Sequence, residues 1–384
     1  MIQLNGMTWN HTRGYLPMVA TAQRFCETHP EVQIHWEKRS LQEFADYPVE
    51  KLAERFDLLV IDHPFVGAAA AQGTLVPLDD LLPESFLKDQ AQNSVGKSHA
   101  SYTYAEHHWA LAIDAATPVA SFRRDLLEQS GTPVPETWED LLELARRGLV
   151  AVPAIAVDSL MNLYLLCSSL GEDPFGTRAK VVSEETGVRA LNLLRELLAL
   201  CPPACFSWNP LATYEAMALG STLAYCPFAY AYSNYARHGY APHRLEFGDM
   251  VSCIEGSRCR STLGGTGLAI SRRCQHKDTA AAYAQFVASP ECQRTLYVES
   301  GGQPGHRSVW LDPKVNELTH GFFQNTLEAH DRAYLRPRYH GYLHFQDHAG
   351  DVVREFLLRG GDARPTLAQL NSIYLESLKT ESGH

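Results

Sequence analysis

The chain has 384 residues, 45% of them hydrophobic and 20% charged, and this length and composition fit a globular protein with two lobes of ordinary size. The net charge of −11 combines 33 basic with 44 acidic residues, and no clustered basic run marks a nucleic-acid surface. No apolar stretch approaches the roughly 20 residues of a membrane-spanning helix.

The N-terminus and the cysteines bear on location. Residues 1–9 have neither the basic segment nor the apolar core of a signal peptide, and their pattern predicts a first strand instead. The nine cysteines are odd in number and scattered, which is typical of unpaired thiols in a reducing compartment. We therefore expect a cytoplasmic protein, with a periplasmic location as the alternative if a signal peptide has been removed.

Strand and helix signals alternate in the first third of the chain. Residues 15–28 have apolar side chains at helical spacing and end before a proline, and residues 32–36 alternate as a strand. The continuous apolar run 58–61 predicts a strand that is buried on both faces of a parallel sheet. This order of elements predicts an open α/β sheet.

The rest of the chain is richer in helix signals. Thr137, followed three residues later by Asp140, predicts a capped helix over 138–147. An apolar stripe over 188–198 predicts another helix, which ends before Pro202. A strand is expected over 263–271, and helices are expected from about residue 278 and from Ser289.

Four segments, in this order, carry a resemblance to a known family. They are DLLVID and GTLVPLD in residues 57–79, PETWEDL in 135–141, EAMALGSTLA in 215–224, and GGTGLAIS, SPECQRTL and GGQP within 264–304. Together they resemble the extracellular solute-binding protein family 1, the maltose-binding-protein-like class that serves ABC sugar importers. The resemblance covers nearly the whole chain.

The resemblance implies a fold and a function. The fold is the two-lobed periplasmic-binding-protein-like α/β fold of type II, with an open mixed sheet in each lobe and crossing hinge segments between them. The lobes are expected at 1–112 plus 256–310 and at 113–255 plus 311–384. The implied function is capture of one small polar ligand (a sugar, a sugar acid or a similar hydroxylated or carboxylated compound) by hinge closure. We expect a monomer that works with an ABC permease, binds no nucleic acid, needs no cofactor and is not an enzyme.

Candidate ligand contacts follow the predicted strands, where such folds bind small molecules. Trp9, His11 and Arg13 follow the first strand and suit ring stacking and an acidic group; the alternative is a capped helix with Trp9 in the core. His63 follows the buried strand and suits hydroxyl recognition, and Asp114 lies at the first crossover, where its carboxylate can bind paired hydroxyls or an amine. Their alternatives are a satisfied histidine and a charged hinge turn.

Later candidates come from aromatic and glycine-rich segments. Tyr225 and Phe228, with Trp208 upstream, suit stacking on a ring, although core packing is the alternative. Gly265 permits close approach of the backbone to a ligand, or simply shapes a turn. Arg338 and Tyr342 lie in a segment that resembles the part of the family's second lobe that reaches the cleft.

Three other interpretations stay open. A thiaminase-like intracellular transferase or sensor on the same scaffold would use Cys226 as its nucleophile. The histidines at positions 340, 344 and 348 recur every fourth residue, so they would align toward a metal on a helix; Gly341 weakens that helix and no metal is expected. A purely structural interaction module would bind no small molecule.

Overall fold

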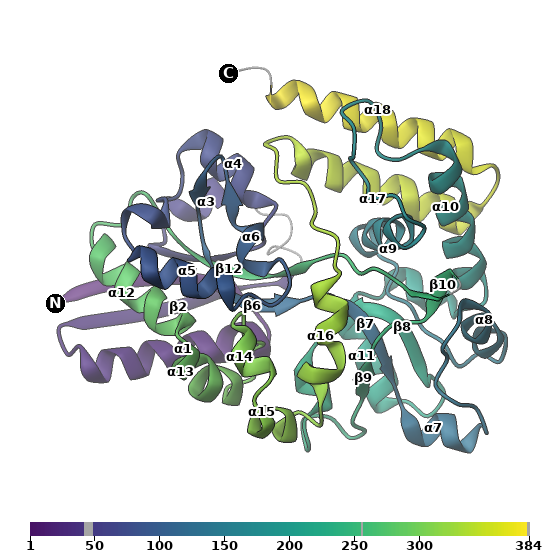
Figure 1. The fold of residues 1–384 in the computed structure, drawn as a ribbon, viewed down its shortest axis with the longest axis horizontal. Helices are drawn as coiled ribbons and strands as arrows, with labels where there is room; N and C mark the ends of the chain where they lie inside the picture. Colours follow the sequence, from purple (N-terminus) through teal and green to yellow (C-terminus); the bar gives the residue numbers. More distant parts are fainter. Residues whose placement is uncertain (42–48, 255, 382–384) are drawn as a thin grey trace.

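The computed structural model describes residues 1–41, 49–254 and 256–381, and it forms two α/β lobes that lie side by side (Figure 1). The first lobe is built on a five-stranded sheet with the order β2-β1-β3-β12-β6, and the second on a three-stranded sheet with the order β8-β7-β9. The α/β class predicted from the alternating signals is therefore confirmed.

The strands of the first sheet are β1 (Ile2–Trp9), β2 (Val32–Arg39), β3 (Leu58–Ile61), β6 (Leu111–Ala116) and β12 (Gly264–Ile270). Those of the second are β7 (Pro118–Phe122), β8 (Tyr225–Tyr230) and β9 (Glu246–Gly248). Two short pairs complete the described strands, β4 (Thr103–Tyr104) with β5 (His107–His108) and β10 (Ser252–Ile254) with β11 (Ser257–Arg258).

The longer helices, in chain order, are α1 (Thr12–Thr28), α4 (Phe65–Gln72), α5 (Glu84–Gln92), α7 (Arg124–Gln129), α8 (Trp138–Arg146), α9 (Ala156–Ser169), α10 (Glu184–Ala199), α11 (Pro210–Leu219), α12 (Lys277–Ala288), α15 (Pro313–Leu318), α16 (Phe322–Asp331), α17 (Tyr342–Arg359) and α18 (Ala363–Glu381). Shorter ones are α3 (Val49–Ala53), α6 (Ser98–Ser101), α13 (Pro290–Cys292) and α14 (Arg307–Trp310), with single turns η1 (Leu78–Asp80), η2 (Pro203–Ser207), η3 (Ser233–Ala236) and η4 (Gln293–Tyr297). Within the described ranges, no helix has the length and apolarity that a bilayer crossing requires.

Strand β3 is buried on both faces, as its continuous apolar run predicts. Leu58 and Val60 face the core formed with α1 and α12, whereas Leu59 and Ile61 face the core formed with α3 and α4. The strand pairs parallel with β1 and antiparallel with β12, so the first sheet is mixed. This packing fixes the carboxyl end of β3, and with it the loop that follows, at the edge that faces the second lobe.

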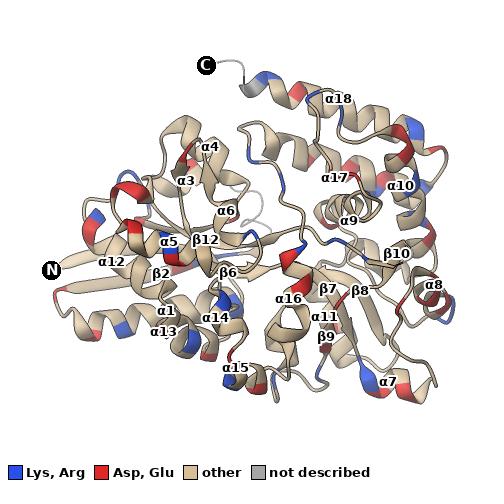
Figure 2. Cartoon of the chain, in the orientation of Figure 1, with Lys and Arg blue, Asp and Glu red and all other residues tan. Residues whose placement is uncertain are grey.

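Helix α9 is the central helix of the second lobe. Every residue from Asp158 to Ser169 is buried, and the helix packs against α10 and α17. Its first turn points back toward the first lobe, and no side chain caps its N-terminus. Helix α8 has the predicted capping box, in which Thr137 and Asp140 bond reciprocally. Acidic and basic residues are interspersed over both lobes (Figure 2).

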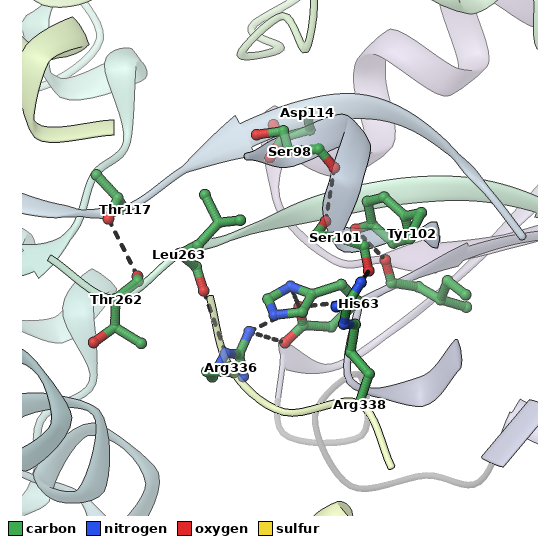
Figure 3. A network of polar contacts seen from close by, with 12 residues as sticks. His63, Ser98, Ser101, Tyr102, Asp114, Thr117, Thr262, Leu263, Arg336 and Arg338 are labelled. Atoms are coloured by element: carbon green, nitrogen blue, oxygen red, sulfur yellow. Dashed lines mark hydrogen bonds and ion pairs between the residues drawn. The ribbon is translucent and has the colours of Figure 1, made fainter. Parts of the chain in front are cut away.

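The chain crosses between the lobes in adjacent segments. The first runs from β6 to β7 through Thr117, and the hydroxyl of this residue donates to the carbonyl of Thr262 on the second segment at 3.1 Å (Figure 3). The third runs beside the second, with the amide of Leu263 donating to the carbonyl of Tyr334 at 2.7 Å. These hydrogen-bonded crossings form the hinge region, while the exact lobe boundaries at 112, 255 and 310 stay predictions.

Candidate functional site

A cavity of about 200 Å³ lies between the two lobes. Its wall combines the end of β1, the loop after β3, the start of β12 and the first turn of α9. The residues that line it are Trp9, Arg13, Leu41, Asp62, Phe65, Ala116, Ile155, Val157, Asp158, Met161, Asn209, Pro210, Tyr230, Tyr232, Gly264, Gly265, Thr266, Arg336, Leu343 and Gln346. Strand ends and helix N-termini are where α/β folds collect ligand-binding groups, so this cavity is the candidate site.

Aromatic rings form part of the cavity wall, and glycines allow their positions. Trp9 packs over Gly14, where an added Cβ would lie 2.3 Å from the indole ring. Tyr230 packs in the same way on Gly264, with 2.5 Å between its Cε1 and an added Cβ. These rings present apolar faces with polar tips, which suit a ligand that has both C–H and hydroxyl groups.

A buried ion pair lies beside the cavity. The Nε of Arg13 donates to Asp114 Oδ2 at 2.9 Å, its Nη2 contacts Oδ1, and the two side chains are only 5% and 0% exposed. The Nη1 of Arg13 also donates to the carbonyl of Ala231 in the second lobe at 2.9 Å, and the guanidinium lies 4.7 Å from the ring centre of Tyr232. Arg13 therefore links α1, β6 and the second lobe, and its charge is already neutralised.

A second ion pair, between Asp62 and Arg336, forms part of the cavity wall. The Nη2 of Arg336 donates to both carboxylate oxygens of Asp62, at 2.8 and 2.7 Å. Its Nε donates to the carbonyl of Leu263 and its Nη1 to Gln346 on α17. Although burial disfavours the carboxylate, Arg336 and His63 hold the pKa of Asp62 well below its ordinary value. This pair joins the loop after β3 to the hinge and to α17.

Three polar atoms around the cavity have no hydrogen-bond partner among the described residues. They are Oδ2 of Asp158, the hydroxyl of Tyr230 and the hydroxyl of Thr266, and all three residues line the cavity. Buried polar atoms are nearly always hydrogen-bonded in folded proteins. These three atoms, on α9, β8 and β12, are therefore in place to bind the hydroxyl groups of a ligand.

Asp158 is the acidic residue of this set and lies in the first turn of α9. Burial raises the pKa of its carboxyl group to about 8. Because this folded-state value is above the ordinary one, the folded protein binds an extra proton between about pH 4 and pH 8. The contribution of that proton to stability is complete below about pH 4 and is lost as the pH rises through 8.

We therefore expect Asp158→Asn to stabilise the ligand-free protein more at pH 8 than at pH 5. The amide keeps the shape of the side chain and carries no charge at either pH. The difference in unfolding free energy between the two pH values can reach about 4 kcal/mol. Urea unfolding of both proteins at the two pH values measures it. An equal effect of the substitution at both values would contradict a buried, unpaired carboxyl group.

The structure brings part of the predicted site together. Trp9, Arg13 and Gly265 line the cavity, at the strand ends where ligand contacts are expected in such folds. Asp114 does not line the cavity but pairs with Arg13, and the side chains of both residues are buried. His11 lies outside the lining, where its Nδ1 accepts from the amide of Arg13 and its ring packs edge-on against Tyr232.

His63 is completely buried and is not part of the lining. Its Nδ1 lies 3.2 Å from Asp62 Oδ1, and its Nε2 has no hydrogen-bond partner in the part of the chain that the structure describes. Burial, with the nearby charge of Arg336, lowers the pKa of His63 to about 4. The ring is therefore neutral at pH 7. It contacts Asp62 of the Asp62–Arg336 pair and does not reach the cavity.

Five other predicted contacts lie away from the cavity. Tyr225, Phe228 and Tyr342 are fully buried in the core of the second lobe, and Trp208 packs against the same core. We correct these predictions, because β8 begins at Tyr225 and the strand runs on to Tyr230 before it reaches the cavity edge. Arg338 also points elsewhere, since its Nη1 donates to the carbonyls of residues 100, 101 and 103.

Neither the proposed nucleophile nor the three histidines considered as metal ligands line the cavity. Cys226 is fully buried, and burial raises the pKa of its thiol well above the ordinary value. His340 precedes α17, whereas the rings of His344 and His348 lie 4.2 Å apart on it. Among the described residues, no group of three or more histidine, cysteine, aspartate or glutamate side chains is arranged to hold a metal.

Sequence reasoning missed Asp158, Tyr230 and Thr266 as site residues. Asp158 is the one charged residue between positions 149 and 171, in a stretch that is otherwise apolar or neutral. A lone acid in such a stretch is a signal for a buried functional carboxylate. Tyr230 and Thr266 stand beside the nominated Phe228 and Gly265, so the segments were correct and the residues were not.

The sequence and the fold of this chain are similar to those of known solute-binding proteins. A family model described as bacterial extracellular solute-binding protein matches residues 20–323. The mannitol-binding protein of Pseudomonas aeruginosa is 31% identical over 130 residues, which cover 32% of this chain and 28% of that protein. The chain therefore matches little more than a quarter of that relative's length.

Solved structures resemble the whole chain. Maltose-bound MalE3 of T. maritima has a TM-score of 0.85 at 18% identity, over 97% of this chain and 99% of that one. A solute-binding protein of Agrobacterium radiobacter in complex with ribitol has a TM-score of 0.81 at 18% identity, over 98% of both chains. These similarities confirm the predicted two-lobed periplasmic-binding-protein-like fold.

Proposed function

The chain belongs to the bacterial extracellular solute-binding protein family, and on that premise we propose that it captures one small sugar or polyol in the cavity between its lobes. The observation that carries the proposal is the set of three unpartnered polar atoms at a cavity walled by aromatic rings. Hydroxyl groups both donate and accept hydrogen bonds, so they can satisfy a carboxylate, a phenol and an alcohol together.

The size of the cavity favours a ligand with a single ring or a short chain. Its volume of about 200 Å³ is below the roughly 300–1,000 Å³ of sites for drug-sized ligands. A monosaccharide or a linear polyol therefore fits a cavity of this volume better than an oligosaccharide does. The mannitol-binding relative and the ribitol complex support the polyol side of the proposal.

Contacts between the lobes support capture by closure. On one side of the cavity, the hydroxyl of Thr12 lies 2.9 Å from that of Tyr240, and the amide of Asn234 donates to Thr12. On the other side, the Asp62–Arg336 pair joins the first lobe to the hinge. A ligand that contacts both lobes stabilises this closed arrangement and excludes water from its polar contacts.

Members of the family bind small molecules and work with ABC transporter permeases, and the family is not one of enzymes. For this chain, we propose delivery of the captured ligand to such a permease and no catalysis. The thiaminase-like alternative needs a reactive thiolate, and Cys226 is buried with a raised pKa. The expected monomeric state stays a prediction.

The expected cytoplasmic location is wrong, because the family is extracellular. The inference from the cysteines failed for a physical reason. Seven of the nine thiols are buried and the other two are partly buried, so packing shields them from oxidants whatever the compartment. Unpaired cysteines therefore do not identify a reducing compartment for this fold.

A matched pair of tyrosine variants tests the site. Tyr230→Phe removes a hydroxyl that lines the cavity, and we expect it to weaken binding of the best sugar or polyol about 2- to 12-fold. Tyr225→Phe removes a buried hydroxyl that faces the core, and we expect unchanged affinity. Isothermal titration calorimetry measures both. The opposite ranking, with loss only in Tyr225→Phe, would place the ligand elsewhere.

A further inference from the structure

The positive and negative charges of the side chains around the cavity do not cancel. Four charged side chains line it in the described residues, and two of them, Asp62 and Arg336, form an ion pair with each other. A third, Arg13, is paired with the buried Asp114 behind the wall. The fourth is Asp158, which has no ion-pair partner in the described part of the chain, and its Oδ2 accepts no hydrogen bond there.

Besides Arg13 and Arg336, no described residue that lines the cavity is a lysine or an arginine. The N-terminus of α9 supplies only the partial positive charge of its backbone, about half an elementary charge. The closed cavity therefore carries one uncompensated negative charge when Asp158 is ionised.

We propose that the natural ligand is a hydroxylated molecule that carries an ammonium group, and that Asp158 selects it by pairing with that group. This inference rests on the proposed function, since it concerns the same cavity. A buried carboxylate must be protonated, hydrogen-bonded or paired with a cation, and a ligand amine supplies both the charge and the donors. A neutral polyol supplies donors only, and a sugar acid brings a second negative charge to a cavity whose two arginines are already paired.

The neighbours of Asp158 suit an ammonium group. Asp158, Tyr230 and Tyr232 all line the cavity, and burial raises the pKa of both phenols; the positive charges of Arg336 and Arg13 oppose this rise, and the charge of Asp158 adds a smaller contribution to it. Aromatic faces attract cations, most strongly where water is excluded. Trp9 lines the same cavity, whereas the ring of Tyr232 already lies 4.7 Å from the guanidinium of Arg13. The hydroxyls of Tyr230 and Thr266 remain for the hydroxyl groups of the ligand.

The test compares neutral molecules with their amino counterparts on the full chain. The panel pairs D-glucose with D-glucosamine, and D-sorbitol with 1-amino-1-deoxy-D-sorbitol, with N-acetylglucosamine as an uncharged amide and D-glucuronate as an acid. Affinities are measured by calorimetry at pH 7 for the wild type, for Asp158→Asn and for a control, Asp173→Asn, whose carboxylate pairs with Arg260 at the surface.

We expect the amine of each pair to bind the wild type and Asp173→Asn at least tenfold more tightly than its neutral counterpart. In Asp158→Asn this preference should fall to threefold or less, because the ammonium group loses its anionic partner while neutral and amino ligands meet the same uncharged amide. Equal or tighter binding of the neutral molecules to the wild type, or a preference that persists in Asp158→Asn, would overturn the inference and leave the proposed function standing. If no member of the panel binds the wild type, both fail together.

Discussion

Asp114→Ala is expected to lower the free energy of unfolding by about 3–5 kcal/mol at pH 7. The substitution leaves the guanidinium of Arg13 buried, 5% exposed, without its carboxylate partner. Arg13 also reaches the carbonyl of Ala231, so the same change loosens a link between the lobes. The net worth of a buried pair can be small, but removal of one partner alone is costly, because the other charge stays desolvated.

Urea unfolding of Asp114→Ala measures this loss, and Asp331→Ala is the matched control. Asp331 pairs with Arg307 at the surface, where the two side chains are 39% and 33% exposed. Breaking an exposed pair costs less than about 1 kcal/mol. If both variants lose equally little, Arg13 is solvated in solution and the lobes are not joined through it.

Asp62→Ala is expected to be the second most damaging change, at about 3 kcal/mol. The carboxylate accepts two hydrogen bonds from Arg336, which is 4% exposed, and one from the amide of His63. Because the pKa of Asp62 is lowered in the folded state, its stabilising contribution is complete above about pH 4, declines below that value, and is lost only as the pH falls through the lowered folded-state pKa. The difference from the wild type should therefore shrink in acid.

The comparison for Asp62→Ala is Asp173→Ala, which breaks the half-exposed pair with Arg260. Unfolding free energies at pH 7 and at about pH 2 separate the two changes. We expect a large, pH-dependent loss for Asp62→Ala and a loss under about 1 kcal/mol for the control. A loss for Asp62→Ala that is independent of pH would mean that packing, and not the charge of the carboxylate, explains the effect.

The fold was predictable because its signals are local. The apolar run of β3 and the capping box at Thr137 each follow from a few neighbouring residues. The order of such elements, together with the resemblance of four segments, predicted the two lobes. Strand ends predicted Trp9, Arg13 and Gly265, because the chain must turn where a strand leaves the sheet.

The rest of the site depends on contacts between distant residues. Arg13 and Asp114 are 101 positions apart, so their pairing cannot be read from spacing. Tyr225 and Phe228 were nominated from an aromatic run, but that run is β8 itself, and the cavity begins where it ends, at Tyr230 and Tyr232. Asp158 reaches the cavity because α9 is buried in the second lobe and its first turn lies at the cavity wall.

A substitution that fills the cavity tests whether the ligand binds between the lobes. Val157 lines the site on the first turn of α9, and Val157→Trp places a large ring in a space of about 200 Å³. For the tightest-binding sugar, polyol or amino derivative, calorimetry of the wild type should give one ligand per chain. The variant should bind at least tenfold more weakly, with an unchanged far-ultraviolet spectrum. Undiminished binding by a folded Val157→Trp protein would show that the ligand does not lie between the lobes.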